Sequence, residues 1–288
     1  MCEVKTIAVS IEKCYVDKNI CKKEYCSTSE FNASKAVRAQ LLLKRKINLE
    51  RLDLEGTTYD IIAYIGLDAS YAKYRDGSIG VGVAVAINAK NCQVIDYACY
   101  LSKICVPYIP GLLAFREAQL MIGAYLRLMH KLKNQSSRRL EILFVNGHGI
   151  AHPRGLGIAS HIGVVLDKPA IGVAKRILTG NPAREIMYER GVKLQELVMN
   201  NRVTGFVLED SYGKIIISPG HKISMHDIPA HVLKCKQGLL PVPIAVADSI
   251  SKKLAKEIRN ITSRGFIEEL LCSNTIPVKN ILDYISSA

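Results

Sequence analysis

The first half of the chain alternates between apolar runs and turn-forming residues. Residues 61–72, 78–91 and 92–106 form three apolar segments, with turn signals at Asp76-Gly77 and at 88–91 between them. Strands joined by short turns pair antiparallel, so this pattern predicts a three-strand meander whose first strand ends near Asp68. Gly80 and Gly82 either weaken the second strand or let another element approach it closely.

The second half of the chain alternates between helical and extended patterns. Apolar residues recur at helical spacing over 112–133, and the next segments predict a strand at 141–145, a helix at 155–167 and a strand at 169–175. This alternation is typical of parallel strands with crossover helices. Two further strands, at 203–210 and 213–219, flank a turn at Tyr212-Gly213, and the chain from 224 onward is mostly helical.

The order of these elements predicts one α/β domain with a mixed sheet over residues 33–260. A three-strand antiparallel meander followed by alternating helices and strands is the order of the ribonuclease H-like fold, although this is an analogy of order alone. A helix at 34–51, with Ala36, Leu43 and Ile47 on one face, begins this domain. Residues 1–32 are interpreted as an N-terminal extension and residues 261–288 as a C-terminal helical tail.

Composition and charge favour a globular protein that binds nucleic acid. Of the 288 residues, 49% are hydrophobic and 23% charged, which excludes a disordered chain. The net charge of +13 favours polyanionic partners, with nucleic acid first and an anionic membrane surface second. Without a basic amphipathic helix carrying aromatic anchors, we expect no membrane partner. The alternative is that the excess of lysine only keeps the chain soluble.

The cysteines and the apolar runs bear on where the protein works. Nine cysteines, an odd number in no disulfide-like spacing, indicate a reducing compartment, and we expect a cytoplasmic protein. Cys14, Cys21 and Cys26 lie close in sequence, but their gaps differ from those of zinc motifs, so we expect free thiols there. No apolar run is long enough to cross a bilayer, and the N-terminus lacks the pattern of a signal peptide.

Several polar residues follow predicted strands, where α/β sheets form their sites. Asp68 and Asn146 stand at strand ends, Glu117 lies in the helix after the meander, and His221 follows a late strand. Carboxylates that meet there would hold Mg²⁺, a hard ion that prefers oxygen ligands and can activate water for phosphodiester hydrolysis. An amide at position 146 is unexpected, because metal-dependent hydrolysis would use a carboxylate in this place.

Each of these residues also has a structural interpretation. Asp68 can cap a turn, Glu117 can face solvent, and His152 and His221 can be satisfied structural histidines. Lys175, which follows an apolar strand, is either a surface lysine or a phosphate ligand beside an acidic site.

Four segments together resemble one family. The segments "PYIPGLLAFRE" (107–117), "NGHGIAHPRGLGIASHIG" (146–163), "IGVAKRIL" (171–178) and "PGHKIS" (219–224) occur in the order seen in endonuclease V, a family of DNA-damage repair nucleases that act on deaminated bases, chiefly deoxyinosine. The resemblance implies a ribonuclease H-like fold. It also implies a hydrolase that cuts one DNA strand at the second phosphodiester bond 3′ to the lesion, with Mg²⁺ or, as a substitute, Mn²⁺.

The resemblance further implies roles for individual residues. Asp68 and Glu117 match metal carboxylates, and Lys175 and His221 match polar residues near the scissile phosphate. Asn146 stands where the family has a metal-binding Asp, and this departure puts catalytic turnover in doubt. The remaining matches concern the base: Tyr108 matches an aromatic wedge that fills the gap left by the displaced base, and Gly111, Leu113, Gly147, His152 and Ile158 match positions around the base pocket.

The physics of base recognition agrees with these roles. An enzyme that acts on one altered base must take it out of the stack, which costs a few kcal/mol, and an inserted aromatic ring recovers part of that cost. Inosine pairs badly and therefore flips more cheaply than a normal base. Glycines in the loops at 111 and 147 let main-chain groups approach the base edge.

Three hypotheses follow from the sequence. The first is an endonuclease that acts on DNA containing deoxyinosine. The second, favoured by Asn146, is a protein that binds inosine-containing nucleic acid with little or no cleavage. The third is an inosine-specific RNA endonuclease, because the sequence does not show whether a ribose 2′-OH is tolerated. In each case we expect a monomer.

Overall fold

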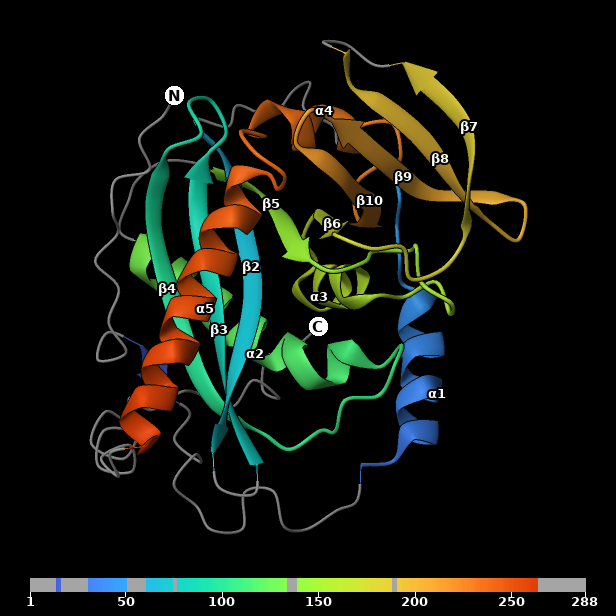
Figure 1. Ribbon diagram of the computed structural model, residues 1–288. Helices are drawn as coiled ribbons and strands as arrows, with labels where there is room; N and C mark the ends of the chain where they lie inside the picture. The colour runs from blue at the N-terminus through green and yellow to red at the C-terminus, as the bar shows by residue number, and fades with distance from the viewer. Residues whose placement is uncertain are drawn as a thin grey trace.

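A single mixed sheet of ten strands organises the molecule (Figure 1). The computed structural model describes residues 14–16, 31–50, 61–74, 77–133, 139–187 and 191–263. The strands are β1 (Tyr15–Val16), β2 (Ile61–Tyr74), β3 (Gly77–Asn88), β4 (Val94–Ile104), β5 (Arg139–Asn146), β6 (Ala170–Ala174), β7 (Asn181–Met187), β8 (Lys193–Met199), β9 (Arg202–Asp210) and β10 (Gly213–His221). Their order across the sheet is β1-β4-β3-β2-β5-β6-β10-β9-β8-β7.

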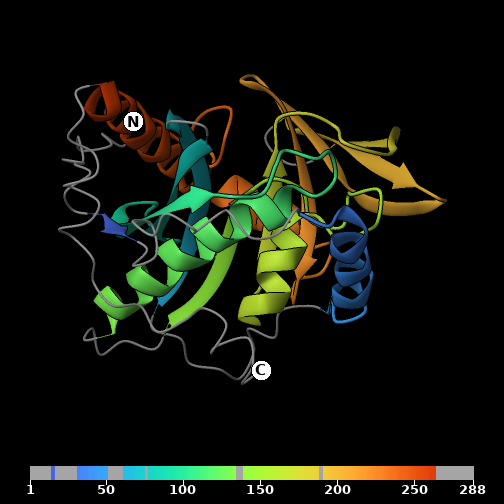
Figure 2. The ribbon, with the colours of Figure 1, turned by 90° about the horizontal axis from the view of Figure 1, so that it is seen from below.

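Helices cover both faces of this sheet (Figures 1 and 2). They are α1 (Ala33–Lys44), α2 (Leu113–Leu132), α3 (Ile158–Leu166), α4 (Ile228–Lys234) and α5 (Val242–Ser263). The two longest, α2 and α5, lie on opposite faces of the meander, and each buries its own apolar cluster against it. Helix α3 packs beside α2, and α1 stands against α3. Among the described residues no helix is both long and apolar enough to span a bilayer.

The pairing of the strands confirms the predicted meander and the parallel strands. Strands β2, β3 and β4 pair antiparallel in sequence order, while β5 pairs parallel with β2, and β6 pairs parallel with β5. The predicted hairpin around Tyr212 is formed by β9 and β10. Strands β7 and β8 are absent from the prediction because polar residues interrupt their apolar positions; β8 becomes a strand by pairing with β9, and β7 by pairing with β8 at the sheet edge.

Strand β2 does not end near Asp68, as its pattern predicts, but continues to Tyr74. Its antiparallel pairing with β3 extends without interruption to the pair of Tyr74 with Gly77. The acidic residue therefore lies in the middle of a buried strand, where only its tertiary surroundings can compensate its charge.

Two glycines let the helices lie directly on the strands. A Cβ atom at Gly82 would lie 2.1 Å from the carbonyl oxygen of Leu120 in α2, and one at Gly66 would lie 1.9 Å from that of Pro243, at the start of α5. The close-approach interpretation of the β3 glycines is thereby confirmed, because any side chain would push α2 away from the sheet.

The first helix is shorter than predicted. Asn32 caps α1 by accepting a hydrogen bond from the Lys35 backbone N–H at 2.9 Å, but the helix ends at Lys44 and not near 51. Beyond it, the Asn48 carbonyl accepts from the Lys222 N–H at 2.6 Å, and the Asn48 N–H donates to His221 Nδ1 at 3.2 Å. These tertiary hydrogen bonds replace the helical ones and draw the chain onto the end of β10.

The expectation of free thiols is wrong for the described cysteines. Disulfides join Cys14 to Cys99 and Cys92 to Cys235, across 85 and 143 residues of sequence. Sequence spacing could not reveal such pairs, because the sheet and the docking of α4 bring the partners together. Cys14 precedes β1, which pairs parallel with β4, so this part of the N-terminal extension belongs to the sheet. Cys21 and Cys26 lie outside the described residues, as does the predicted tail beyond 263.

The Cys92–Cys235 disulfide should stabilise the native protein. Replacing both residues by serine should lower the free energy of unfolding by roughly 2 to 4 kcal/mol, because a cross-link over a long loop restricts the unfolded chain. Urea unfolding without reductant measures this difference. In excess dithiothreitol the two proteins should unfold alike, and equal stability in the absence of reductant would contradict the prediction.

His161 in α3 should make stability depend on pH. Its Nδ1 is enclosed without a hydrogen-bond partner, its ring packs edge-on against Phe115, and burial lowers its pKa from 6.5 to about 4. Because the unfolded chain binds the proton more readily, stability is lost as the pH falls from 6.5 toward 4. Between pH 7 and pH 5 the native protein should lose about 1 to 2 kcal/mol more than a His161→Leu variant, measured by urea unfolding. Parallel pH profiles would disprove this role.

Candidate active site

The site begins where β5 stops beside a strand that continues. Strands β2 and β5 are paired up to Leu67 and Val145, after which β5 ends at Asn146 while β2 runs on to Tyr74. The ends of parallel strands are where α/β proteins place their sites. Here the ending of β5 opens one edge of β2, so that side chains from both faces of the sheet can meet at Asp68.

Asp68 is buried and held by two hydrogen bonds. Only 3% of it is exposed; its Oδ1 accepts from Asn146 Nδ2 at 2.6 Å, and its Oδ2 accepts from the Ser251 hydroxyl of α5. Burial raises the pKa of Asp68, and the charge of Asp248 raises it further, while both hydrogen bonds lower it. The carboxylate is thus oriented by neutral donors that leave its charge uncompensated.

Glu117 brings a second carboxyl group from α2, on the face of the sheet opposite to α5. It lies on α2 and is 7% exposed; burial, and then the charge of Asp68, raises its pKa to about 8, and Arg116 offsets this only in part. A cavity of about 280 Å³ reaches Glu117 and is lined on its far side by Lys252 and Arg259 of α5. Glu117 therefore reaches an opening with basic walls and lies close enough to Asp68 to feel its charge.

This group of oxygens fits a hard divalent cation. The described residues contain no group of three His, Cys, Asp or Glu side chains placed to hold a metal. A third protein ligand would therefore be the Asn146 amide, whose Oδ1 takes the place of Nδ2 when the amide turns over. A cation there would offset the burial and the repulsion that raise the carboxyl pKa values, and oxygen ligands suit Mg²⁺ or Mn²⁺.

Asp248, which the sequence did not single out, joins the group from α5. Its Oδ2 lies 2.6 Å from Lys252 Nζ and 4.0 Å from Lys175 Nζ, so it draws Lys175 from the end of β6 toward Asp68. The sequence feature that could have indicated this role is the acid at position 248, one helix turn before Ser251 and next to the apolar face of α5. That signal has meaning only once α5 is known to lie on β2.

His221 lies apart from this group. It pairs with Ala170 at the start of β6, whereas Asn146 pairs with Val173 near the end of the same strand. Its Nδ1 accepts from the Asn48 N–H, and its Nε2 faces Asp167 at 3.4 Å. The structure therefore brings together Asp68, Glu117, Asn146 and Lys175, and it does not bring His221 to them.

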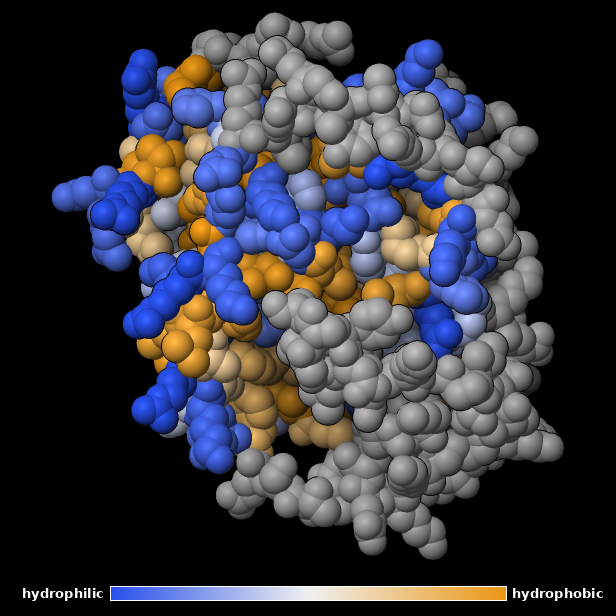
Figure 3. Space-filling view, turned by 180° about the vertical axis from the view of Figure 1, so that it is seen from behind, coloured by the Kyte–Doolittle hydropathy of each residue, from blue (hydrophilic) through white to orange (hydrophobic). Residues whose placement is uncertain are grey.

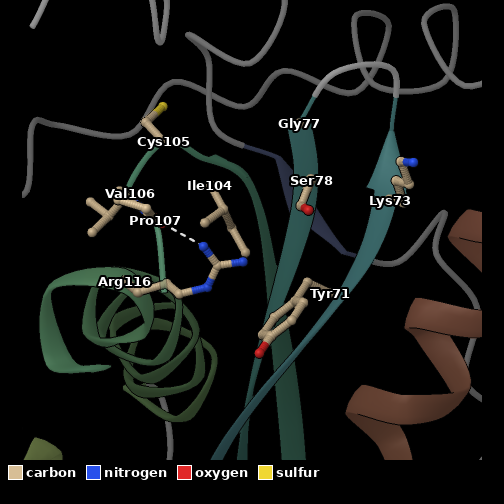
Figure 4. A pocket seen from close by; sticks show the side chains of 9 residues that line it. All are labelled: Tyr71, Lys73, Gly77, Ser78, Ile104, Cys105, Val106, Pro107 and Arg116. Atoms are coloured by element: carbon tan, nitrogen blue, oxygen red, sulfur yellow. Dashed lines mark hydrogen bonds between the residues drawn. The ribbon is translucent and has the colours of Figure 1, made fainter. Parts of the chain in front are cut away.

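The loop between β4 and α2 presents Tyr108 to solvent, with 65% of the residue exposed. Arg116, next to Glu117 on α2, donates a hydrogen bond from its guanidinium to the Val106 carbonyl and lies 4.8 Å above the Tyr71 ring (Figure 4). Arg116, Val106 and Tyr71 line a cavity of about 530 Å³ at the foot of the loop. The exposed ring therefore projects from a loop that is anchored beside the carboxylates.

The expected base-pocket residues come together in two touching loops. The Gly111 carbonyl accepts a hydrogen bond from His152 Nε2 at 3.0 Å, and burial lowers the pKa of His152 to about 4, so the ring is neutral. Gly147 has a φ of +152°, and a Cβ there would lie 2.3 Å from Cγ2 of Ile158. Leu113, the first residue of α2, lies two residues after Gly111.

Comparisons with known proteins point to one family. The sequence profile of the endonuclease V family matches residues 42–249. Endonuclease V of Aeropyrum pernix is 41% identical over 226 residues, covering 78% of this chain and 80% of its own length. That of Desulfurococcus amylolyticus is 37% identical over 240 residues, covering 80% of this chain and 99% of its own.

Two solved structures share the fold. The crystal structure of a Streptomyces avermitilis endonuclease V has a TM-score of 0.66 at 27% identity, over 80% of this chain and 95% of the other. A Ciona intestinalis endonuclease V, solved with a 24mer DNA containing an inosine followed by a ribo-adenosine, has a TM-score of 0.63 at 24% identity, over 78% of this chain and 98% of the other. On this evidence of sequence and architecture, the chain belongs to the endonuclease V family.

Proposed function

We propose that this chain is a metal-dependent endonuclease that recognises deoxyinosine in DNA and hydrolyses the second phosphodiester bond 3′ to it. The observation that carries the proposal is the meeting of Asp68 and Glu117, buried acids from opposite faces of the sheet, where β5 ends. Membership of a nuclease family and a relative solved with inosine-containing DNA support it. The meander followed by alternating helices and strands supports a ribonuclease H-like fold.

In this proposal Asp68, Glu117 and Asn146 hold Mg²⁺, with Mn²⁺ as a substitute. When bound, the ion would activate a water and stabilise charge on the phosphate. Asp68 is kept in one orientation by Asn146 and Ser251, which prepares its oxygens for a ligand. Lys175, with 45% of its side chain exposed, is placed to meet a phosphate oxygen while Asp248 limits its movement.

Recognition of the base falls to the loops beside this group. Tyr108 would enter the duplex as a wedge, and the flipped base would be read by main-chain groups near Gly111 and Gly147, where no side chain intervenes. The net charge of +13 would bind phosphates on either side of the lesion without reading their sequence. Neither step needs a second copy of the chain, so we propose a monomer.

One observation favours a second function, that of an inosine-binding protein that cleaves slowly or not at all. Asn146 donates a hydrogen bond to Asp68, where the family pattern places another negative charge. A neutral ligand keeps the shape of the site but holds a divalent ion less tightly than a carboxylate does. Binding and cleavage are therefore separable in this chain.

Restoring the carboxylate should raise activity. Asn146→Asp should nick inosine-containing DNA at least ~10² times faster than the unmodified chain, which corresponds to roughly 3 kcal/mol of barrier. The assay follows single-turnover nicking of matched oligonucleotides with inosine or adenine, in DNA and in RNA, over a series of Mg²⁺ and Mn²⁺ concentrations. Higher metal concentration should recover part of the rate of the unmodified chain.

The control for this assay is a check that residue 146 is still asparagine in the protein whose rate is measured. Asn146 precedes Gly147, and asparagine before glycine deamidates readily because glycine has no side chain to hinder attack of its backbone nitrogen on the amide, so intact mass and peptide mapping must accompany each rate. If protein with intact Asn146 cuts as fast as Asn146→Asp, the added charge is dispensable. Faster cutting of inosine RNA than of inosine DNA would reassign the substrate.

The wedge role of Tyr108 can be tested by removing its ring. Tyr108→Ala should weaken binding to inosine duplexes by roughly 1 to 3 kcal/mol, the range for base–aromatic stacking, and leave binding to undamaged duplex nearly unchanged. Tyr212→Ala is the matched control, because Tyr212 is 59% exposed and lies on the β9–β10 turn. Fluorescence anisotropy measures both, and an equal loss on both duplexes would exclude the wedge.

A further inference from the structure

The amide of Gln40 is buried in α1, where an apolar side chain would be expected. Only 1% of the residue is exposed, whereas its neighbours Leu41 and Leu42 are 47% and 57% exposed. On the face seen in Figure 3, hydrophilic and apolar side chains alternate along the edge of the molecule that carries this helix. A buried amide is costly unless its donors and acceptor are satisfied, so its partners indicate what it does.

Gln40 bridges the two loops that form the candidate base pocket. Its Nε2 donates to the carbonyl of Gly111 at 2.9 Å and to that of Leu156 at 3.2 Å, and its Oε1 accepts from Arg154 Nε at 2.5 Å. One partner belongs to the loop that carries Tyr108 and two belong to the loop that carries His152. Gln40 therefore holds both loops to α1 and adds to the direct hydrogen bonds between them.

The Gly111 carbonyl is the point where these contacts converge. It accepts from Gln40, from His152 Nε2 and from Arg154 Nη2 at 2.5 Å. Gly111 has a φ of +77°, and a Cβ there would lie 2.5 Å from Arg154 Nη2, so the guanidinium lies directly against the main chain. His152 and Arg154 belong to the opposing loop, while Gln40 reaches the same oxygen from α1.

The other end of the Tyr108 loop is fixed independently. Arg116 holds the Val106 carbonyl and stands next to Glu117 on α2. The loop from 106 to 111 is thus tied at one end to the helix that carries a catalytic carboxyl group and at the other to α1. Without Gln40, His152 and Arg154 would still join the two loops and the carboxylates would stay in place, but neither loop would be held against α1, which would let the base pocket widen.

We propose that Gln40 is a positioning residue for base selection: by fixing Gly111 against Leu156 and Arg154, it sets the width of the inosine pocket. This inference rests on the proposed function, because it takes these loops to be the pocket. Gln40 lies two residues before the segment 42–249 that matches the family, in a helix that runs into that segment.

The experiment compares Gln40→Met with the unmodified chain. Methionine has a similar length and no amide donors, so it fills the space and leaves the carbonyls of Gly111 and Leu156 without this partner. Binding of fluorescent oligonucleotides with inosine or adenine is measured at one fixed salt concentration in EDTA. We expect the preference for inosine to fall at least ~10-fold, as loss of a buried hydrogen bond predicts, while adenine binding changes less than about twofold.

Two further variants separate positioning from folding. Gln119→Met makes the same change at an exposed glutamine of α2 and should leave the preference intact. Gln40→Glu keeps the size and the acceptor for Arg154 but puts an oxygen in place of the donor to the two carbonyls, so it should lose the preference. The melting temperature of each variant shows how much of any loss follows a loss of folding. Equal losses on inosine and adenine oligonucleotides, in step with melting temperature, would overturn the proposal in favour of a merely structural role.

Failure of this inference and failure of the proposed function give different results. If the unmodified chain shows no preference for inosine, the proposed function is wrong and the role of Gln40 falls with it. If the unmodified chain prefers inosine and the folded Gln40→Met and Gln40→Glu proteins keep that preference, the function stands and the role of Gln40 is overturned.

Discussion

The repulsion between two buried acids is the interaction on which the site depends. Asp68 and Glu117 are each nearly inaccessible, so burial raises the pKa of both, and the charge of Asp68 raises the pKa of Glu117 further. Such an arrangement persists only because the fold holds both side chains in position and neutral donors orient one of them. It gives a divalent ion more to gain here than at an ordinary surface pair of acids.

The sheet makes that meeting possible through two simple features. Strand β5 ends at Asn146 while β2 continues, so the edge of β2 is open where Asp68 lies. Gly66 and Gly82 let α5 and α2 approach the two faces of the meander at backbone distance, which carries Ser251 and Glu117 within reach of the same opening. Close packing of the main chains therefore positions Glu117 of α2 near Asp68 of β2.

Recognition and chemistry are joined through the loop between β4 and α2. Its first anchor, Arg116, neighbours Glu117, and its second, Gly111, is held by side chains from α1 and from the loop after β5. That latter loop begins at Asn146 itself. These two chain segments thus adjoin Glu117 and Asn146, two of the three candidate metal ligands, and also supply the walls of the candidate pocket. In the proposed function, the flipped base and the phosphate would therefore be held at a fixed separation.

The sequence alone determined the meander, the parallel strands after it, the family and the residues Asp68, Glu117 and Asn146, because periodicity and motifs are local properties of the chain. It failed where a residue's role depends on a distant partner. Tertiary structure decided the edge strands β7 and β8 and the cysteine pairs across 85 and 143 residues. It also decided the placement of His221 away from the carboxylates and the contacts of Asp248 and Gln40. The physical reason is common to them: hydrogen bonds, disulfides and charge interactions act over a few ångströms in space, and only the packed sheet and helices determine which residues lie that close.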